Sequence, residues 1–276
     1  FFLISETLAA GVRVYVVSIP IQLMLGIGVL PAIVLFVVLS LIYTYIGGVK
    51  AVIWTDAVQF GLFLLGGLFA LFYIPTLVDG GFSGLMSQAA QAGKLHWFNP
   101  EFGLAAPFNI WMGIIGGTVL VLSSHGAEQL IVQRVLACKN VADGRKALVL
   151  SAALVFPLFL IFLFVGVMLW VFYQGHPFKI PLPEAQSGIK ANDFIFPIFM
   201  MTEVPHVLRG FLIVAILSAA MSSVSSALTS LASVSTMDFV KHVVRDRSEE
   251  FYLRFSKRST VFWAGALILI AYLSRQ

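Results

Sequence analysis

The sequence has little charge and almost no cysteine. Only 11% of its 276 residues are Asp, Glu, Lys or Arg, while 59% are hydrophobic and the mean hydropathy is +0.97. This composition excludes an ordinary soluble domain. The single cysteine, Cys138, excludes an internal disulfide, and the five histidines lack the spacing of a metal site. No basic segment precedes a short apolar core, so no apolar run has the pattern of a cleavable signal peptide.

Long apolar runs are abundant instead, and seven of them are long or apolar enough to cross a membrane. We expect these spans near 1–25, 31–46, 51–75, 107–137, 146–174, 207–240 and 257–276. The sequence therefore predicts an all-α polytopic membrane protein. Because the chain begins inside an apolar run without an initiator Met and ends soon after a span, we also expect a fragment of a longer protein.

Basic residues gather in every second connection between the spans. The connections after the second, fourth and sixth spans carry Lys50, Arg134, Lys139, Arg145, Lys146, Lys241, Arg245, Arg247, Arg254, Lys257 and Arg258. The other connections carry only Lys94, Lys179, Lys190 and Arg209. By the positive-inside rule the first set is cytoplasmic, so the chain would begin in the cytoplasm and end outside. The formal charge of +4 thus indicates a basic juxtamembrane segment at 241–258 rather than a nucleic-acid partner.

A narrow stripe of hydroxyl groups runs along the span 207–240. At about 100° per residue, one side of a helix would carry Ser218, Ser222, Ser225, Ser226, Thr229 and Ser233. Lipid offers these groups no hydrogen-bond partner. Two interpretations remain open: small residues that let helices pack closely, with hydroxyls bonded to their own backbone, or a cluster of oxygen ligands for a hard cation such as Na⁺. From this span alone, packing is favoured.

Two other spans contain acidic residues. Asp56 is the sole acid of the span 51–75, and Gln59 adds a polar group beside it. An acid inside a helix bundle is a functional candidate, although Asp56 lies near the inner end of its span, where a solvated side chain is the alternative. In the first span, Glu6 and Arg13 lie seven residues apart on one helical face. Mutual charge neutralisation is slightly favoured there over direct contact of Arg13 with an anionic substrate.

The fourth span combines glycines with polar residues. Gly113, Gly116 and Gly117 predict a loosened helix, as in the broken helices of transporters. His125 and Glu128 lie three residues apart, which favours a satisfied intrahelical pair over a zinc or catalytic dyad.

Two segments resemble motifs of a known family. The segment 47–59, GGVKAVIWTDAVQ, and the segment 222–238, SSVSSALTSLASVSTMD, are similar to the sodium:solute symporter family of sodium–sugar, proline and sialic acid cotransporters. The resemblance extends over essentially all 276 residues. It implies a five-plus-five inverted-repeat (LeuT-type) fold. In that fold, residues 1–276 form a single transmembrane domain that matches core helices three to nine, with helices one, two and ten absent.

The resemblance also implies two sodium sites. One uses the carbonyl of Ala219 and the hydroxyls of Ser222 and Ser223, together with helix one. The second uses the Asp56 carboxylate and the hydroxyls of Ser222, Ser225 and Ser226. These are all oxygen ligands, which suit a hard cation, and one carboxylate formally neutralises a monovalent ion. With the resemblance, the cation interpretation of the stripe becomes the preferred one.

The expected function is Na⁺-coupled symport of a small solute by alternating access, with Na⁺ and the solute as partners in a cell inner (plasma) membrane, and no enzymatic activity. Sugar-transporting members carry an amide and a lysine where this chain has Val121 and Ala153, so a polar or anionic organic solute is preferred to a hexose. Its candidate contacts are Ser123, Ser124, His125, Gln129 and Arg13. An ion channel is disfavoured because the polar residues come in patches. An intramembrane hydrolase using Ser, His125 and an acid stays open.

Overall fold

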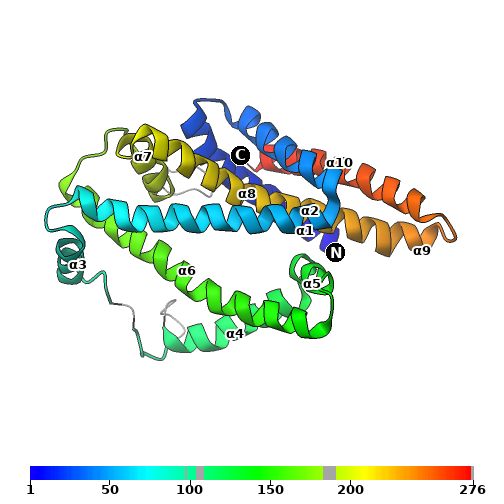
Figure 1. Cartoon of the computed structure of the whole chain (residues 1–276), viewed down its shortest axis with the longest axis horizontal. Helices are drawn as coiled ribbons and strands as arrows, with labels where there is room; N and C mark the ends of the chain where they lie inside the picture. Colours follow the sequence, from blue (N-terminus) through cyan, green and yellow to red (C-terminus); the bar gives the residue numbers. More distant parts are fainter. Residues whose placement is uncertain (97, 104–108, 183–190, 275–276) are drawn as a thin grey trace. The chain divides into compact units, whose positions relative to one another are not determined.

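The computed structural model describes residues 1–96, 98–103, 109–182 and 191–274, and this described part of the chain is helical and contains no strand. Its α-helices are α1 (Phe2–Leu25), α2 (Val29–Tyr73), α3 (Gly81–Gln91), α4 (Ile110–Ala127), α5 (Gln129–Leu136), α6 (Val141–Gly175), α7 (Ile195–Thr202), α8 (His206–Val234), α9 (Lys241–Val243) and α10 (Glu249–Leu273). Two short 3₁₀ helices, η1 (Ile74–Leu77) and η2 (Ala191–Phe194), and a π-helix, η3 (Ser235–Val240), complete it (Figure 1). The predicted all-α class is confirmed.

Five helical stretches among the described residues are long and apolar enough to cross a membrane: Phe2–Leu25, Val29–Leu77, Ile110–Ala127, Val141–Gly175 and His206–Val243. The second contains two of the predicted spans, 31–46 and 51–75. Gly48 separates them, with φ 58° and ψ −157°, a conformation that glycine adopts without steric cost. The predicted span 257–276 overlaps α10, which ends at Leu273 and is not among the five, and residues 275–276 lie outside the described part of the chain.

The chain divides into two compact units, residues 67–177 and the remainder, 1–66 with 178–276. In the larger unit, α1, α8 and α10 pack around one apolar core that includes Val14, Phe36 and Leu228. Gly11 brings α1 close to α10, because a β-carbon at this position would clash with Ile270. The packing buries one side of α8, and therefore decides which of its serines face the protein interior.

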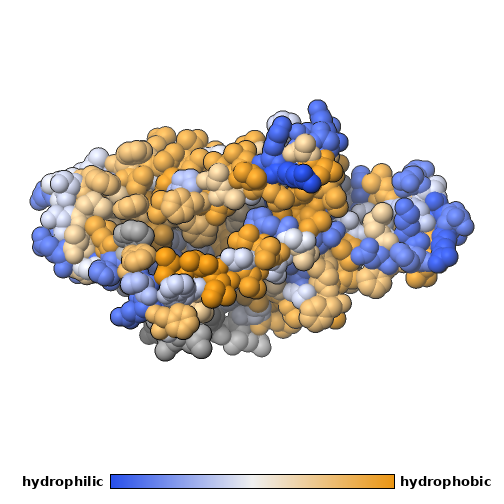
Figure 2. Space-filling model, turned by 90° about the horizontal axis from the view of Figure 1, so that it is seen from below, coloured by the Kyte–Doolittle hydropathy of each residue, from blue (hydrophilic) through white to orange (hydrophobic). Residues whose placement is uncertain are grey.

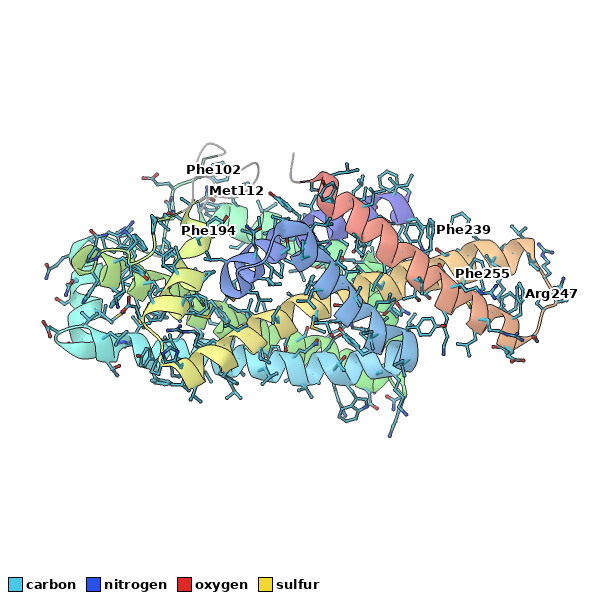
Figure 3. The ribbon with its side chains drawn as sticks, turned by 90° about the horizontal axis from the view of Figure 1, so that it is seen from above. Phe102, Met112, Phe194, Phe239, Arg247 and Phe255 are labelled. Carbon is cyan, nitrogen blue, oxygen red and sulfur yellow. The ribbon has the colours of Figure 1, made fainter. Side chains whose placement is uncertain are left out.

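The C-terminal end of α8 continues directly into the π-helix η3. There the indole Nε1 of Trp263 on α10 donates to Ser235 Oγ at 2.9 Å. Figure 3 shows Phe239 of η3 and Phe255 of α10 near this end, with Arg247 at the turn between α9 and α10. Arg247 lies 5.8 Å from the centre of the Phe251 ring, so the predicted basic segment is partly ordered by cation–π contacts.

In the smaller unit, α3, α5 and η1 pack against α6. Leu85 and Ala89 of α3 are fully buried, whereas no described residue of α4 is buried. Large hydrophobic side chains stay exposed along α4 and α6, and Figure 2 shows how hydrophobic residues cover much of the face that it draws. Such exposure is expected where a helix meets lipid or further helices rather than water.

The expected loosening of the fourth span is wrong in position. Gly113, Gly116 and Gly117 all lie within the continuous helix α4. The helix is interrupted at Glu128, with φ −74° and ψ 123°, and α5 begins at the next residue. The Glu128 carbonyl accepts from Val132 N at 3.0 Å, so helical hydrogen bonding resumes within one turn. Glycine alone did not break the helix, because each glycine can keep its intrahelical hydrogen bonds.

Candidate cation site

The serine stripe of α8 is buried at its centre. The exposed fraction is 0% for Ser225 and 8% for Ser226. Ser225 Oγ donates to the carbonyl oxygen of Ser222 at 3.0 Å, and Ser226 Oγ donates to the same carbonyl at 2.7 Å. Each hydroxyl proton is thus directed at the helix backbone, which leaves oxygen lone pairs as the outward-facing groups. This bonding is common to both interpretations of the stripe.

Tyr43 links this part of α8 to α2. Its hydroxyl Oη donates to the carbonyl oxygen of Met221 at 3.1 Å, across 178 residues of sequence. The side chains of Ser225, Gln59 and Ser40 lie within hydrogen-bonding reach of Tyr43, and Asp56 acts on it electrostatically. Groups from both halves of α2 and from α8 therefore meet around one tyrosine, including the predicted ligands Asp56 and Ser225.

Asp56 and Gln59 lie on the half of α2 that follows Gly48. The Asp56 residue is partly exposed, but its carboxylate oxygen Oδ1 is buried. Gln59 is 8% exposed, and its amide oxygen Oε1 is buried without a hydrogen-bond partner among the described residues. The region combines one carboxylate with several neutral oxygens, which is the donor set that a hard monovalent cation requires.

Soft or nitrogen ligands are not gathered here. Within the described residues, no group of three or more His, Cys, Asp or Glu side chains could hold a metal ion. The donor set around Tyr43 is built from hydroxyl, amide and carboxylate oxygens, which suit a hard cation such as Na⁺. A bound Na⁺ would be formally neutralised by Asp56, which lowers the cost of burying the ion.

The other predicted sodium ligands lie on a different side of α8. Ala219 and Ser223 line a cavity of about 460 Å³ between α1 and α8, together with Val16, Val17 and Phe194. Ser223 is exposed, in contrast to the buried Ser225, because the two residues are about 200° apart around the helix. Ser222 is half-buried, and its carbonyl accepts both neighbouring hydroxyls. Ser223 and Ser225 thus lie on opposite sides of α8, and Ser222 belongs to both predicted sets of ligands.

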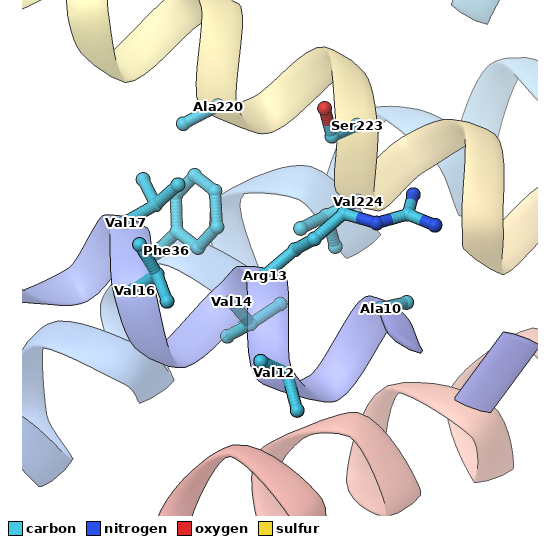
Figure 4. Close-up of a pocket in the computed structure, with 10 residues that line it drawn as sticks. All are labelled: Ala10, Val12, Arg13, Val14, Val16, Val17, Phe36, Ala220, Ser223 and Val224. Atoms are coloured by element: carbon cyan, nitrogen blue, oxygen red, sulfur yellow. The ribbon is translucent and has the colours of Figure 1, made fainter. Parts of the chain in front are cut away.

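A second cavity, of about 230 Å³, lies between α1 and α8 and contains Arg13 (Figure 4). The aliphatic part of the Arg13 side chain runs past Val224 below Ser223. Arg13 Nη2 lies 3.7 Å from Glu6 Oε1, and the Glu6 side chain is 8% exposed against 46% for Arg13. The favoured neutralisation within α1 is therefore present, while the guanidinium still borders the cavity.

The predicted solute contacts on the fourth span lie in the unit 67–177, whereas Arg13 belongs to the other unit. Ser123 is exposed, and Ser124, His125 and Gln129 are half-buried. His125 Nδ1 lies 2.9 Å from Ser124 Oγ. The expected intrahelical pair of His125 with Glu128 is wrong, because the helix ends before Glu128 and His125 bonds its immediate neighbour instead.

Tyr43 was not among the residues singled out from the sequence. A signal was available, because a tyrosine within the span 31–46 needs a partner for its hydroxyl in a medium that supplies none. Gln59 was noted only as a polar neighbour of Asp56. The partner of Tyr43 could not be found, since it is a backbone carbonyl on a helix 178 residues away.

Comparison with known proteins gives a consistent picture. The model of the sodium:solute symporter family matches residues 2–276. The sodium/sialic acid symporter SiaT of Proteus mirabilis (strain HI4320) is 32% identical over 238 residues, which are 86% of this chain and 47% of that protein. The human sodium-coupled monocarboxylate transporter 1 is 27% identical over 276 residues, 99% of this chain and 44% of that protein. The chain thus spans about half the length of the curated relatives it matches.

A solved structure agrees with the fold. It is the substrate-bound, outward-open state of a Na⁺-coupled sialic acid symporter, described as revealing a novel Na⁺ site. The match has a TM-score of 0.87 at 28% sequence identity and covers 99% of this chain and 57% of that one. The helices of this chain are therefore arranged as in a Na⁺-coupled symporter.

Proposed function

The chain belongs to the sodium:solute symporter family, a family of transporters and not of enzymes, and from this premise we propose that the protein couples Na⁺ entry to the uptake of a small organic anion. The protein is an integral membrane protein, because it belongs to this family of transporters and contains helices that are long and apolar enough to cross a membrane. We assign it to the plasma (inner) membrane, with residues 1–276 matching core helices three to nine of the five-plus-five repeat fold.

The single observation that carries the proposal is the group of polar side chains around Tyr43. It joins the Asp56 segment of α2 to the buried serine turn of α8. In the proposed site, Na⁺ is held by the Asp56 carboxylate and by the hydroxyl oxygens of Ser222, Ser225 and Ser226. The hydroxyl protons of Ser225 and Ser226 are already donated to a backbone carbonyl, so both oxygens can face the ion without reorientation.

Such a site couples ion binding to conformation. An ion shared between α2 and α8 stabilises the state in which the two helices are held together. If that state is also the one that binds solute, each ligand raises the affinity for the other by the same factor. Alternating access then moves both across the membrane together. A second Na⁺, bound by Ser222 together with Ala219 and Ser223, which line the cavity, would require a further helix to complete its ligands.

An organic anion is the preferred solute for two reasons. The relatives are named for sialic acid and for monocarboxylates, which share a carboxylate group. Arg13 borders a cavity beside α8, and its guanidinium can bind a carboxylate through two parallel hydrogen bonds. Ser123, Ser124, His125 and Gln129 on α4 and α5 stay predicted polar contacts of the solute, as the sequence suggested.

Solute uptake into vesicles tests the proposal. The intact protein is reconstituted into liposomes and supplied with labelled sialic acid or a labelled short monocarboxylate under an inward Na⁺ gradient. We expect accumulation above the external concentration, and none when K⁺ replaces Na⁺. Equal uptake in the two salts would contradict the proposal. Ion flux without solute would indicate a channel, and chemical conversion of the solute would indicate a hydrolase.

A further inference from the structure

The amide oxygen of Gln59 is buried and has no hydrogen-bond partner among the described residues. The residue as a whole is 8% exposed. Burying a carbonyl oxygen without a partner costs folding free energy, so natural proteins keep such groups rarely and mostly where they bind something. Gln59 lies three residues after Asp56 on the same helix, which places both side chains on one face of α2.

Tyr43 determines which end of the amide stays unpaired. Tyr43 Oη has one proton, and it donates this proton to the Met221 carbonyl. Gln59 lies within hydrogen-bonding reach of Tyr43, and the only group of Gln59 that can donate to Oη is its amide Nε2. The amide nitrogen is thereby used, and the amide oxygen Oε1 is the group left to accept from something else.

The surroundings of this oxygen are those of a cation site. Asp56 acts electrostatically on Tyr43, and Ser225 lies within hydrogen-bonding reach of it, so both lie near the residue that faces Gln59. Ser225 is fully buried, with its proton directed at the Ser222 carbonyl. A single cation can bind the oxygen lone pairs of Asp56, Gln59 and Ser225 at the same time.

We propose that Gln59 Oε1 is a further ligand of the cation held by Asp56 and the α8 serines, and that Tyr43 is a positioning residue that fixes the Gln59 amide. This inference rests on the sodium site proposed above. Neutral amide oxygens are common ligands of hard cations, and this one adds a contact without changing the net charge of the site.

Thermal unfolding of the intact purified protein, titrated with NaCl against choline chloride, tests the role of Gln59. A ligand that binds only the folded protein raises the Tm in a concentration-dependent way. For Gln59→Leu we expect the Na⁺ concentration of half-maximal stabilisation to rise about tenfold. We also expect the Tm in choline chloride to stay the same or rise, because a buried unpaired oxygen has been removed. An unchanged half-maximal Na⁺ concentration would overturn the proposal.

A second variant keeps the test decisive if Gln59→Leu does not fold. Gln59→Glu has almost the same shape, keeps Oε1 and adds a negative charge. We expect it to bind Na⁺ more tightly than the wild type. An unchanged Na⁺ dependence in this variant would equally overturn the assignment, because a charge placed on a ligand must affect the ion.

Tyr43→Phe separates positioning from packing. It keeps the ring but removes the acceptor of the Gln59 amide, so we expect a several-fold loss of apparent Na⁺ affinity, smaller than that of Gln59→Leu. A residue that only packs would lower the Tm equally in both salts and leave the Na⁺ dependence unchanged, and that result would remove Tyr43 from the proposal.

Gln22→Leu is the matched control. The amide oxygen of Gln22 is also buried without a partner among the described residues, but Gln22 lies on α1 and is not among the groups that act on Tyr43. We expect its Na⁺ dependence to equal that of the wild type. Asp56→Asn distinguishes the two proposals. A shift in Asp56→Asn without one in Gln59→Leu refutes only the Gln59 ligand, whereas no shift in Asp56→Asn refutes the sodium site itself.

Discussion

The helices α8 and α4 are alike in composition and differ in their surroundings. Both are apolar and both contain adjacent serines. In the span His206–Val243, 44% of the most apolar stretch is buried inside the protein. In the span Ile110–Ala127, none of the corresponding stretch is buried. Buried Ser225 of α8 lies beside Tyr43 of α2, whereas the described contacts of Ser124 on α4 stay within its own helix, at the Val121 carbonyl and at His125.

This comparison shows what turns a polar patch into a site. A hydroxyl on a membrane helix can always bond to its own backbone, as Ser225 and Ser124 both do. What differs is whether a second helix brings complementary groups to it. For α8 this second helix is α2, with Asp56, Gln59 and Tyr43. The assignment of a cation site is therefore stronger for α8 than the assignment of solute contacts is for α4.

The largest difference in stability between the two helices is expected when a serine of each is replaced by a bulky residue. Ser225→Leu places a large side chain at a fully buried position beside Tyr43, so we expect a destabilisation of about 1–3 kcal/mol. Ser123→Leu lies on the exposed surface of α4 and should change stability by less than about 0.5 kcal/mol. Thermal unfolding in one detergent measures both. Equal destabilisation would mean that α4 is buried as tightly as α8 in the intact protein.

A smaller effect is expected when a single hydroxyl is removed. Ser225→Ala deletes one proposed Na⁺ ligand with little change in volume. We expect a loss of about 1–2 kcal/mol in Na⁺ binding, close to a tenfold rise in the Na⁺ concentration for half-maximal uptake. The corresponding change on α4, Ser124→Ala, should leave this concentration unchanged in the absence of solute. A shift in both variants would place α4 at the ion site.

The solute contacts give the converse prediction. Ser124→Ala or His125→Ala should weaken solute binding several-fold through the loss of about 1 kcal/mol of hydrogen bonding. Sodium affinity measured without solute should stay nearly constant. Equilibrium binding of labelled solute at saturating Na⁺, and of Na⁺ alone, checks the two halves. Equal losses in both would move these residues to the ion site or indicate general damage to the fold.

The last of these tests concerns orientation and changes no affinity. The positive-inside rule places Lys139, which follows α5, and Arg247, which follows α9, in the cytoplasm, with Lys94 outside. Lys190 is also expected outside, and it lies beyond the described residues. Cysteines introduced singly into a Cys138→Ser background should react with an impermeant external reagent at 94 and 190 only. External labelling of position 247 would reverse the topology.

The sequence alone was sufficient for the helices and for several of their ends. The αL conformation of Gly26, with φ 65°, ends α1 at Leu25, where the first span was predicted to end, and Gly48 interrupts α2 between the predicted spans 31–46 and 51–75. Pattern and turn chemistry are local properties, so they can be read from neighbouring residues. The interruption at Glu128 was missed because glycine content indicates where a helix can break and not where it does.

The candidate site was predicted in part. Asp56 and the serine stripe were singled out from their places within the spans, and the family resemblance joined them into one sodium site. Their roles as sodium ligands stay a proposal. Tyr43 and the free oxygen of Gln59 required the structure, because they depend on a contact between helices that are distant in sequence. Which hydroxyls of α8 are buried was equally inaccessible, since an amphipathic stripe does not identify its partner helix.

Sodium binding by Asp56→Asn tests the central claim most directly. The substitution keeps the size of the side chain and one oxygen but removes the charge that neutralises the ion. The purified protein is titrated with NaCl against choline chloride, and Tm is measured. We expect the Na⁺ concentration of half-maximal stabilisation to rise by a factor above about ten, which is a larger shift than that of Ser225→Ala. A wild-type Na⁺ dependence in Asp56→Asn would contradict a cation site between α2 and α8.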